Sequence, residues 1–152
     1  MTRRPHLLRD SSILREPGVQ RLLGLLSGDG EEARIIGGAV RNALLGLPHG
    51  DIEALGLRIG GFAYAPDLNS IPSASEAMFE NLDTLLIDAL RYRPHPSHFS
   101  LDETLAAIER FKPRRAVLTN MHTDLDYETL RMSLPKNVAP AFDGMQLTID
   151  RG

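Results

Sequence analysis

The sequence predicts an α/β fold, in which helices pack against a largely buried sheet. Short apolar segments of strand type alternate with segments of helical spacing along the chain, an order that is typical of α/β layers. The segment 84–89 is almost continuously apolar, as expected for a strand that is buried on both faces.

Turn residues and apolar spacing place the individual elements. The predicted helices are 13–26, 39–45, 74–79 and 101–111. The predicted strands are 33–36, two short strands within 55–64, 84–89, 116–119 and 145–149. Pro17 suits a helix start, and Gly46 with Pro48 ends the second helix. The helix 101–111 is amphipathic, with Ser100 or Asp102 as its cap.

Composition narrows the class of protein. A chain of 152 residues with 42% hydrophobic and 24% charged residues is typical of one soluble globular domain. The net charge of −3 predicts no general affinity for nucleic acid. Because there are no cysteines, histidines and carboxylates are left as metal ligands. No apolar segment approaches the roughly 18 residues that would span a bilayer, so we expect a cytoplasmic protein without membrane partners.

A possible nucleotide site lies in the first third of the chain. Gly37 and Gly38 follow a predicted strand and open a helix, so backbone N–H groups could approach a phosphate. Arg41 could pair with a phosphate oxygen. Asp51 and Glu53 share one face of an extended segment and could hold Mg²⁺ for nucleotidyl transfer. The alternative, a simple turn followed by a solvated strand edge, stays open.

The segments LREPGVQRLLGLL and IIGGAVRNALLGLP, within about residues 12–53, resemble the N-terminus of CCA-adding tRNA nucleotidyltransferases and poly(A) polymerase head domains. That family shows GG-x-VRD-x-LLG followed by a D-x-D metal pair. Here Asn42 replaces the Asp of the VRD segment, and Glu53 replaces the second Asp of the metal pair. The resemblance implies nucleotide or RNA binding with Mg²⁺, although the neck and body of that family have no counterpart.

Histidines and an aspartate in turn-like surroundings mark a second site. These residues are His49, Asp67, His95, His98 and His122. Asp67 and His122 follow predicted strands, where a side chain can point into a site at the sheet edge. Each loop histidine alone would usually be just exposed, but imidazole and carboxylate together suit Zn²⁺, Mn²⁺ or Fe.

The segments HGDIEALGLRIGGFAYAPDLNSIP, DTLLIDALRYRPHPSHFSLDETL and RAVLTNMHTDLDY resemble the C-terminal half of metallo-β-lactamase-fold hydrolases over about residues 48–149. The nearest branch is that of phosphodiesterases, which includes the phosphonate-pathway cyclic phosphodiesterase and the tRNA 3′-processing nucleases. The resemblance implies that His49 and His122 bind metal and that Asp67 bridges two metal ions. It also implies that His98 contacts the scissile phosphate and acts as general acid.

The H-x-H-x-D-H motif of that family is absent from the sequence. Each Zn²⁺ or Mn²⁺ would keep about one histidine and a shared carboxylate, whereas a catalytic zinc normally keeps three protein ligands. We therefore expect weak metal binding and impaired hydrolysis. The fold implied is half of an αββα sandwich, with the N-terminal helix-strand-helix segment packed on it.

The segment PHGDIE satisfies both family patterns and predicts a fusion, with one part at 1–48 and the other at 49–152. Three hypotheses remain: a truncated phosphodiesterase-type hydrolase, a nucleotidyltransferase-like nucleotide or RNA binder, and a catalytically inactive fusion. The substrate would be a phosphodiester or a nucleotide. An uncovered sheet face would also promote self-association.

Overall fold

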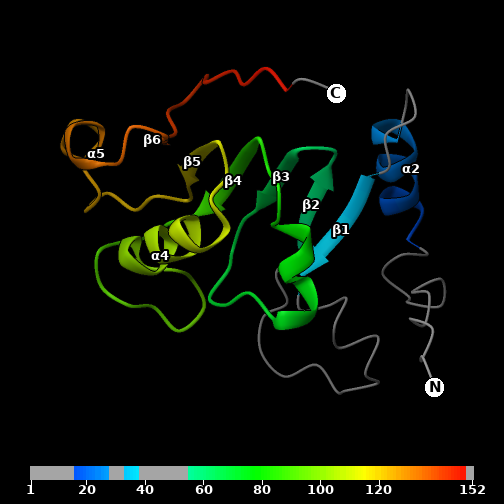
Figure 1. Ribbon diagram of the computed structural model, residues 1–152, viewed down its shortest axis with the longest axis horizontal. Helices are drawn as coiled ribbons and strands as arrows, with labels where there is room; N and C mark the ends of the chain where they lie inside the picture. The colour runs from blue at the N-terminus through cyan, green and yellow to red at the C-terminus, as the bar shows by residue number, and fades with distance from the viewer. Residues whose placement is uncertain (1–15, 28–32, 38–54, 150–152) are drawn as a thin grey trace.

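The computed structural model describes residues 16–27, 33–37 and 55–149 of the chain (Figure 1). Its helices are α2 (Pro17–Leu26), the 3₁₀ helix η2 (Ser73–Met78), α4 (Leu101–Phe111) and α5 (Tyr127–Ser133). Its strands are β1 (Ala33–Gly37), β2 (Leu55–Ile59), β3 (Phe62–Ala65), β4 (Thr84–Asp88), β5 (Arg115–Thr119) and β6 (Val138–Pro140). None of the helices in these ranges is long and apolar enough to cross a membrane.

The strands form one mixed six-stranded sheet in which the spatial order is the chain order, β1-β2-β3-β4-β5-β6. β1 pairs with β2, and β2 with β3, in antiparallel fashion. The pairs β3–β4, β4–β5 and β5–β6 are parallel. The carboxyl ends of β3, β4 and β5 therefore meet at one edge of the sheet, as Figure 1 shows. At such an edge, α/β proteins commonly place their functional side chains.

One face of the sheet builds the core. Ala63, Leu85, Ala116 and Val138 lie side by side in register, and each is buried. They belong to one apolar cluster that also contains Leu101 and Ile108 of α4, which lies in front of the sheet in Figure 1. The apolar segments of β4 and β5 thus fold as central strands because their side chains are buried in the hydrophobic core.

The opposite face is covered less completely. Tyr64, Leu86 and Val117 are in register on this face, and the first two are only half-buried. The C-terminal segment returns to β5, where the Arg115 guanidinium donates to the carbonyl of Thr148 at 3.3 Å. The predicted self-association through an uncovered face stays a prediction.

Helix α4 begins where its sequence signals place it. Ser100 is the N-cap, and its hydroxyl accepts a hydrogen bond from the backbone N–H of Glu103. The Glu103 carboxylate in turn accepts from the Ser100 backbone N–H at 2.8 Å, which completes a capping box. Of the two predicted caps, the structure uses Ser100 and not Asp102. The helix ends at Lys112, whose positive φ of 49° stops the helical hydrogen bonding.

Most predicted elements are confirmed, including the helix that starts at Pro17 and the paired short strands within 55–64. The predicted strand at 145–149 is wrong, because β6 already occupies the edge beside β5. The three-residue β6 and the seven-residue α5 were missed. Both are too short to show a period of their own. The predicted helix 39–45 lies outside the described residues.

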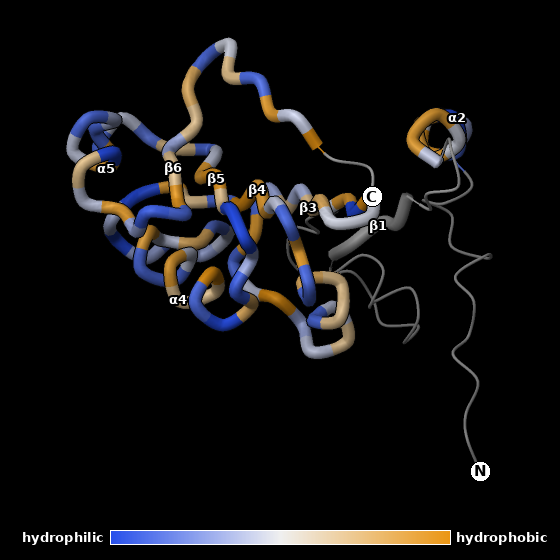
Figure 2. Tube along the Cα trace, turned by 45° about the horizontal axis from the view of Figure 1, so that its top comes forward, coloured by the Kyte–Doolittle hydropathy of each residue, from blue (hydrophilic) through white to orange (hydrophobic). Residues whose placement is uncertain are grey.

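Helix α2 differs from the others in its surroundings. It has no buried residue, and its Leu22 and Leu25 side chains are 51% and 72% exposed. In both Figure 1 and Figure 2 it lies at the opposite end of the molecule from α4 and α5.

The hydrophobic colour in Figure 2 runs along β4 and β5, where the core sits.

Candidate active site

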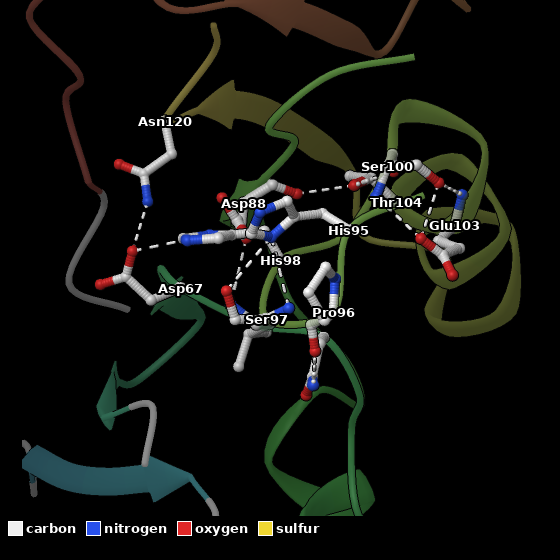
Figure 3. A network of polar contacts seen from close by, with 12 residues as sticks. Asp67, Asp88, His95, Pro96, Ser97, His98, Ser100, Glu103, Thr104 and Asn120 are labelled. Carbon is white, nitrogen blue, oxygen red and sulfur yellow. Dashed lines mark hydrogen bonds and ion pairs between the residues drawn. The ribbon is translucent and has the colours of Figure 1, made fainter. Parts of the chain in front are cut away.

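Polar side chains gather at the carboxyl edge of the three parallel strands. Asp67 follows β3, Asp88 is the last residue of β4, and Asn120 follows β5. His98 reaches the same place from the loop between β4 and α4. Figure 3 shows these four side chains together.

Asp88 and His98 form the closest contact of the site. The Asp88 side chain is fully buried, and its Oδ2 atom lies 3.0 Å from Nδ1 of the His98 ring. The same oxygen accepts the backbone N–H of Leu68 at 3.1 Å. Because a carboxylate accepts here, Nδ1 of His98 carries a proton and Nε2 is left for a substrate.

The environment of Asp88 is unusual for a carboxyl group. Burial raises its pKa, whereas the hydrogen bond and charge of His98 lower it, with smaller contributions from Asn120 and the Phe99 backbone. Its second oxygen, Oδ1, is buried without a hydrogen-bond partner among the described residues. A buried carboxylate is costly unless it is paired. Among the causes that lower the pKa of Asp88, the hydrogen bond and charge of His98 are the largest, so His98 is the main electrostatic support of this buried carboxylate.

Asp67 is held beside this pair by Asn120. The Asn120 amide donates to Asp67 Oδ1 at 2.6 Å, and the same oxygen lies 3.8 Å from His98 Nδ1. Both Asp67 and Asn120 have positive φ angles, 52° and 58°. Asp and Asn tolerate this left-handed conformation better than other residues that carry a side chain. The chain therefore bends at both residues, which brings the two side chains together just beyond the ends of β3 and β5.

Backbone hydrogen bonds on both sides fix the loop that carries His98. Leu90 donates to the Phe99 carbonyl at 2.9 Å, and Leu101 donates to the Arg91 carbonyl at 2.9 Å. The Phe99 N–H also donates to the carbonyl of Leu68. Phe99 itself is buried in the core cluster. His98 is thus positioned by ordered neighbours and does not depend on its own side-chain contacts alone.

A buried threonine connects the site to α4. The Thr104 hydroxyl donates to the Asp88 carbonyl at 2.6 Å and lies 2.9 Å from the carbonyl of Ser100. Because Thr104 is fully buried, its hydroxyl forms its hydrogen bonds with these carbonyls and not with water. The start of α4 is therefore tied to the end of β4, next to His98.

The other two described histidines have different partners. The backbone N–H of His122 donates to Leu90 at 2.7 Å, which places the residue at the site edge. Its side chain is 62% exposed, and Nδ1 lies 3.3 Å from Asp124 Oδ1. The ring of His95 lies with its centroid 5.3 Å from that of His98.

The structure brings together only part of the predicted site. Asp67 Oδ1 lies 3.8 Å from His98 Nδ1, and His122 lies on the same edge but contacts Asp124. Gly37 ends β1, opposite Leu55. The predicted residues outside the described ranges are Gly38, Arg41, His49, Asp51 and Glu53. The metal-binding, nucleotide-binding and catalytic roles of all these residues stay predictions.

Sequence reasoning missed Asp88 and Asn120. An acidic residue at the end of an otherwise apolar strand is a usable signal, because the carboxyl ends of parallel strands gather in one place. Asn120 carries the same signal at the end of β5, but an amide is not a titratable group and was not singled out.

The described residues do not by themselves form a metal centre. They contain no group of three or more His, Asp or Glu side chains arranged to hold a metal ion. Asp67 and His122 are residue types that can bind a metal, yet Asp67 contacts Asn120 and His98, and His122 contacts Asp124. The part of the site that can be described chemically is the Asp88–His98 pair.

The chain matches the beta-lactamase superfamily domain over residues 28–121, which is more than half of its length. It therefore belongs to the metallo-β-lactamase superfamily, whose members typically use divalent metal ions. The α/β architecture and mixed sheet are consistent with a partial version of that fold.

Among solved structures, the chain is similar to a new diphosphatase from the PhnP family. The TM-score is 0.68 with 34% identity, and the match covers 80% of this chain and 44% of that chain. An octanoyltransferase of Porphyromonas gingivalis is 30% identical over 109 residues, which are 70% of this chain and 22% of that protein. The chain thus spans less than half the length of either relative.

The superfamily match begins at residue 28 and so extends across most of the segment 12–53 that resembles nucleotidyltransferases. No finding supports a nucleotidyltransferase part or a role in tRNA processing. The resemblance to metallo-β-lactamase-fold hydrolases is confirmed at the level of the superfamily.

Proposed function

We propose that this chain is a hydrolase of the metallo-β-lactamase fold that cleaves phosphodiester or diphosphate bonds, with His98 as its general acid. The observation that carries the proposal is the 3.0 Å contact between His98 Nδ1 and the buried Asp88 carboxylate. The solved diphosphatase of the PhnP family, at 34% identity, supports phosphorus as the centre attacked. The octanoyltransferase supports no activity here, because the matched segment is only 22% of that protein.

The proposed step is the transfer of one proton. As water attacks phosphorus and the P–O bond to the leaving group breaks, Nε2 of His98 gives its proton to the departing oxygen. Asp88 accepts from Nδ1 and stabilises the imidazolium form that must exist before the transfer. The metal ion typical of the superfamily would activate the water, and Asp67 and His122 would be two of its ligands. The described residues do not provide a complete ligand set.

The missing H-x-H-x-D-H motif should lower the rate of hydrolysis. We expect slow hydrolysis that depends on added Mn²⁺ or Zn²⁺, since fewer than three protein ligands hold a catalytic zinc poorly.

The test compares leaving groups. A p-nitrophenyl phosphodiester has a leaving group that departs without protonation, whereas an alkyl phosphodiester needs an acid. With the full chain and Mn²⁺, His98→Ala should slow the alkyl substrate by about 100-fold or more. The p-nitrophenyl substrate should be slowed far less.

The control is Arg131→Ala, which removes only an exposed ion pair with Glu128 on α5. Equal losses on both substrates in His98→Ala would assign His98 to binding or folding. No loss on either substrate would overturn the proposed function.

A further inference from the structure

His95 is a second ring beside the proposed acid. It lies three residues before His98 in the same loop, and the two planes are tilted by 48° with centroids 5.3 Å apart (Figure 3). The His95 residue is half-buried. Neither the apolar cluster nor the Asp88–His98 pair includes His95.

Ser97 sets the protonation pattern of this ring. Nδ1 of His95 accepts the backbone N–H of Ser97 at 3.3 Å and lies 3.2 Å from the Ser97 hydroxyl. In a neutral imidazole whose Nδ1 accepts, the proton is on Nε2. His95 and His98 thus both have Nδ1 engaged within the protein. Neither Nε2 has a partner among the described residues.

The rest of the loop adds donors. The guanidinium of Arg91 is used inside the loop, donating to the carbonyls of Arg93 and Pro94 at 3.2 and 3.0 Å. The guanidinium of Arg93 is exposed and has no partner in the part of the chain that the structure describes. Two groups left over in this loop, His95 Nε2–H and the Arg93 guanidinium, are therefore N–H donors, a combination that suits the oxygens of an anion.

We propose that His95 is a second phosphate-contacting residue, whose Nε2–H donates to a non-bridging oxygen of the phosphate group on which His98 acts. This inference rests on the proposed function, and it divides the two rings between different oxygens of one substrate. The two contacts from Ser97 engage Nδ1 and leave Nε2–H as the donor available to a ligand. The ligand class is a phosphate group, including the inorganic phosphate ion.

The experiment uses the full chain and inorganic phosphate, with the side-chain nitrogens of the histidines followed by NMR. We expect phosphate to shift the Nε2 resonance of His95. The Kd for phosphate should rise roughly 5- to 10-fold in His95→Ala, which corresponds to one lost hydrogen bond. His95→Gln should restore most of the affinity, because its terminal amide offers an N–H donor at a similar reach.

Two further variants separate binding from packing. His95→Phe keeps an aromatic ring beside His98 but has no donor, so it should bind phosphate as weakly as His95→Ala. Tyr92→Ala, an exposed ring in the same loop, should leave the Kd within about twofold of the wild type. Wild-type affinity in His95→Phe would overturn the inference, as would a wild-type chain that does not bind phosphate.

The two proposals fail separately. If hydrolysis depends on His98 but phosphate affinity does not depend on His95, the function stands and this inference falls. If phosphate affinity depends on His95 but no phosphate bond is cleaved, the binding residue stands and the proposed function falls.

Discussion

Replacing Asp88 with asparagine is the most informative single change in the candidate site. Asp88 Oδ2 accepts from both Leu68 N–H, at 3.1 Å, and His98 Nδ1, at 3.0 Å. The amide oxygen of asparagine can occupy the same place and keep both contacts. Its NH₂ group would then occupy the place of Oδ1, which is buried without a hydrogen-bond partner among the described residues. The variant therefore removes the negative charge while keeping the shape.

The expected loss follows from that charge. A hydrogen bond to a charged group contributes about 1.5–3 kcal/mol, against about 0.5–1.5 kcal/mol for a neutral one. Support for the His98 imidazolium should therefore weaken by about 1–2 kcal/mol, or roughly 5- to 30-fold in kcat/KM. The loss should be larger for an alkyl phosphodiester than for a p-nitrophenyl one, since the first depends more on protonation.

The assay is steady-state hydrolysis of both substrates with a thermal melt on each variant. Asp83→Asn is the matched control, because it makes the same substitution just before β4, at an exposed aspartate paired with Arg114. It should leave kcat/KM unchanged. Wild-type hydrolysis of the alkyl substrate by a folded Asp88→Asn chain would refute the role given to the pair.

The same variant has a predictable pH dependence in stability. Burial raises the pKa of Asp88 in the folded chain. The folded state thus holds the proton more firmly than the unfolded chain, and the contribution of Asp88 to stability is full below its unfolded pKa. It is lost as pH rises through the folded pKa. Relative to wild type, Asp88→Asn should become progressively more stable as pH rises from about 4.

Two other substitutions test the fold. Leu85→Ala, at a fully buried position, should lower the free energy of unfolding in urea by about 2–5 kcal/mol, whereas Leu86→Ala, on the half-buried face, should cost less than half of that. Equal costs would contradict the assignment of the two faces. Ser100→Ala should cost about 1 kcal/mol through loss of the cap. The hydrogen bonds from Ser100 lower the pKa of Glu103, so its carboxylate stabilises the fold above its unfolded pKa and ceases to do so as pH falls through the folded one. Thermal melts should therefore show Glu103→Gln destabilised at neutral pH but not in acid, and the same deficit at both would count against the capping box.

Much of the fold could be predicted from the sequence because its central elements carry strong local signals. The apolar run 84–89 and the amphipathic helix 101–111 are long enough to show their periods, and Ser100 with Glu103 marks the helix start. The failures are at the C-terminal side. Whether β6 or the segment 145–149 pairs with β5 is decided by competition for one sheet edge, which no local pattern records.

The candidate site divides in the same way. Asp67 and His98 could be singled out because both lie in loops, where a polar residue invites a functional interpretation. The importance of Asp88 depends on its burial, which arises only when the segments around Leu68 and Phe99 fold over the end of β4. A sequence pattern shows an acid in an apolar run, but it does not show which loops will enclose it.

The agreement between strand order and chain order has a consequence for synthesis on the ribosome. Each strand from β2 to β6 pairs with the strand that precedes it in the chain, so each of these strands finds a neighbour that has already been synthesised. Pairing between strands that are neighbours in the chain suits growth of the sheet from the N-terminal side as the chain emerges. The edge that bears Asp67, Asp88 and Asn120 is completed only when β5 has joined the sheet. Until that point the nascent chain can form part of the sheet, but the candidate site is still incomplete.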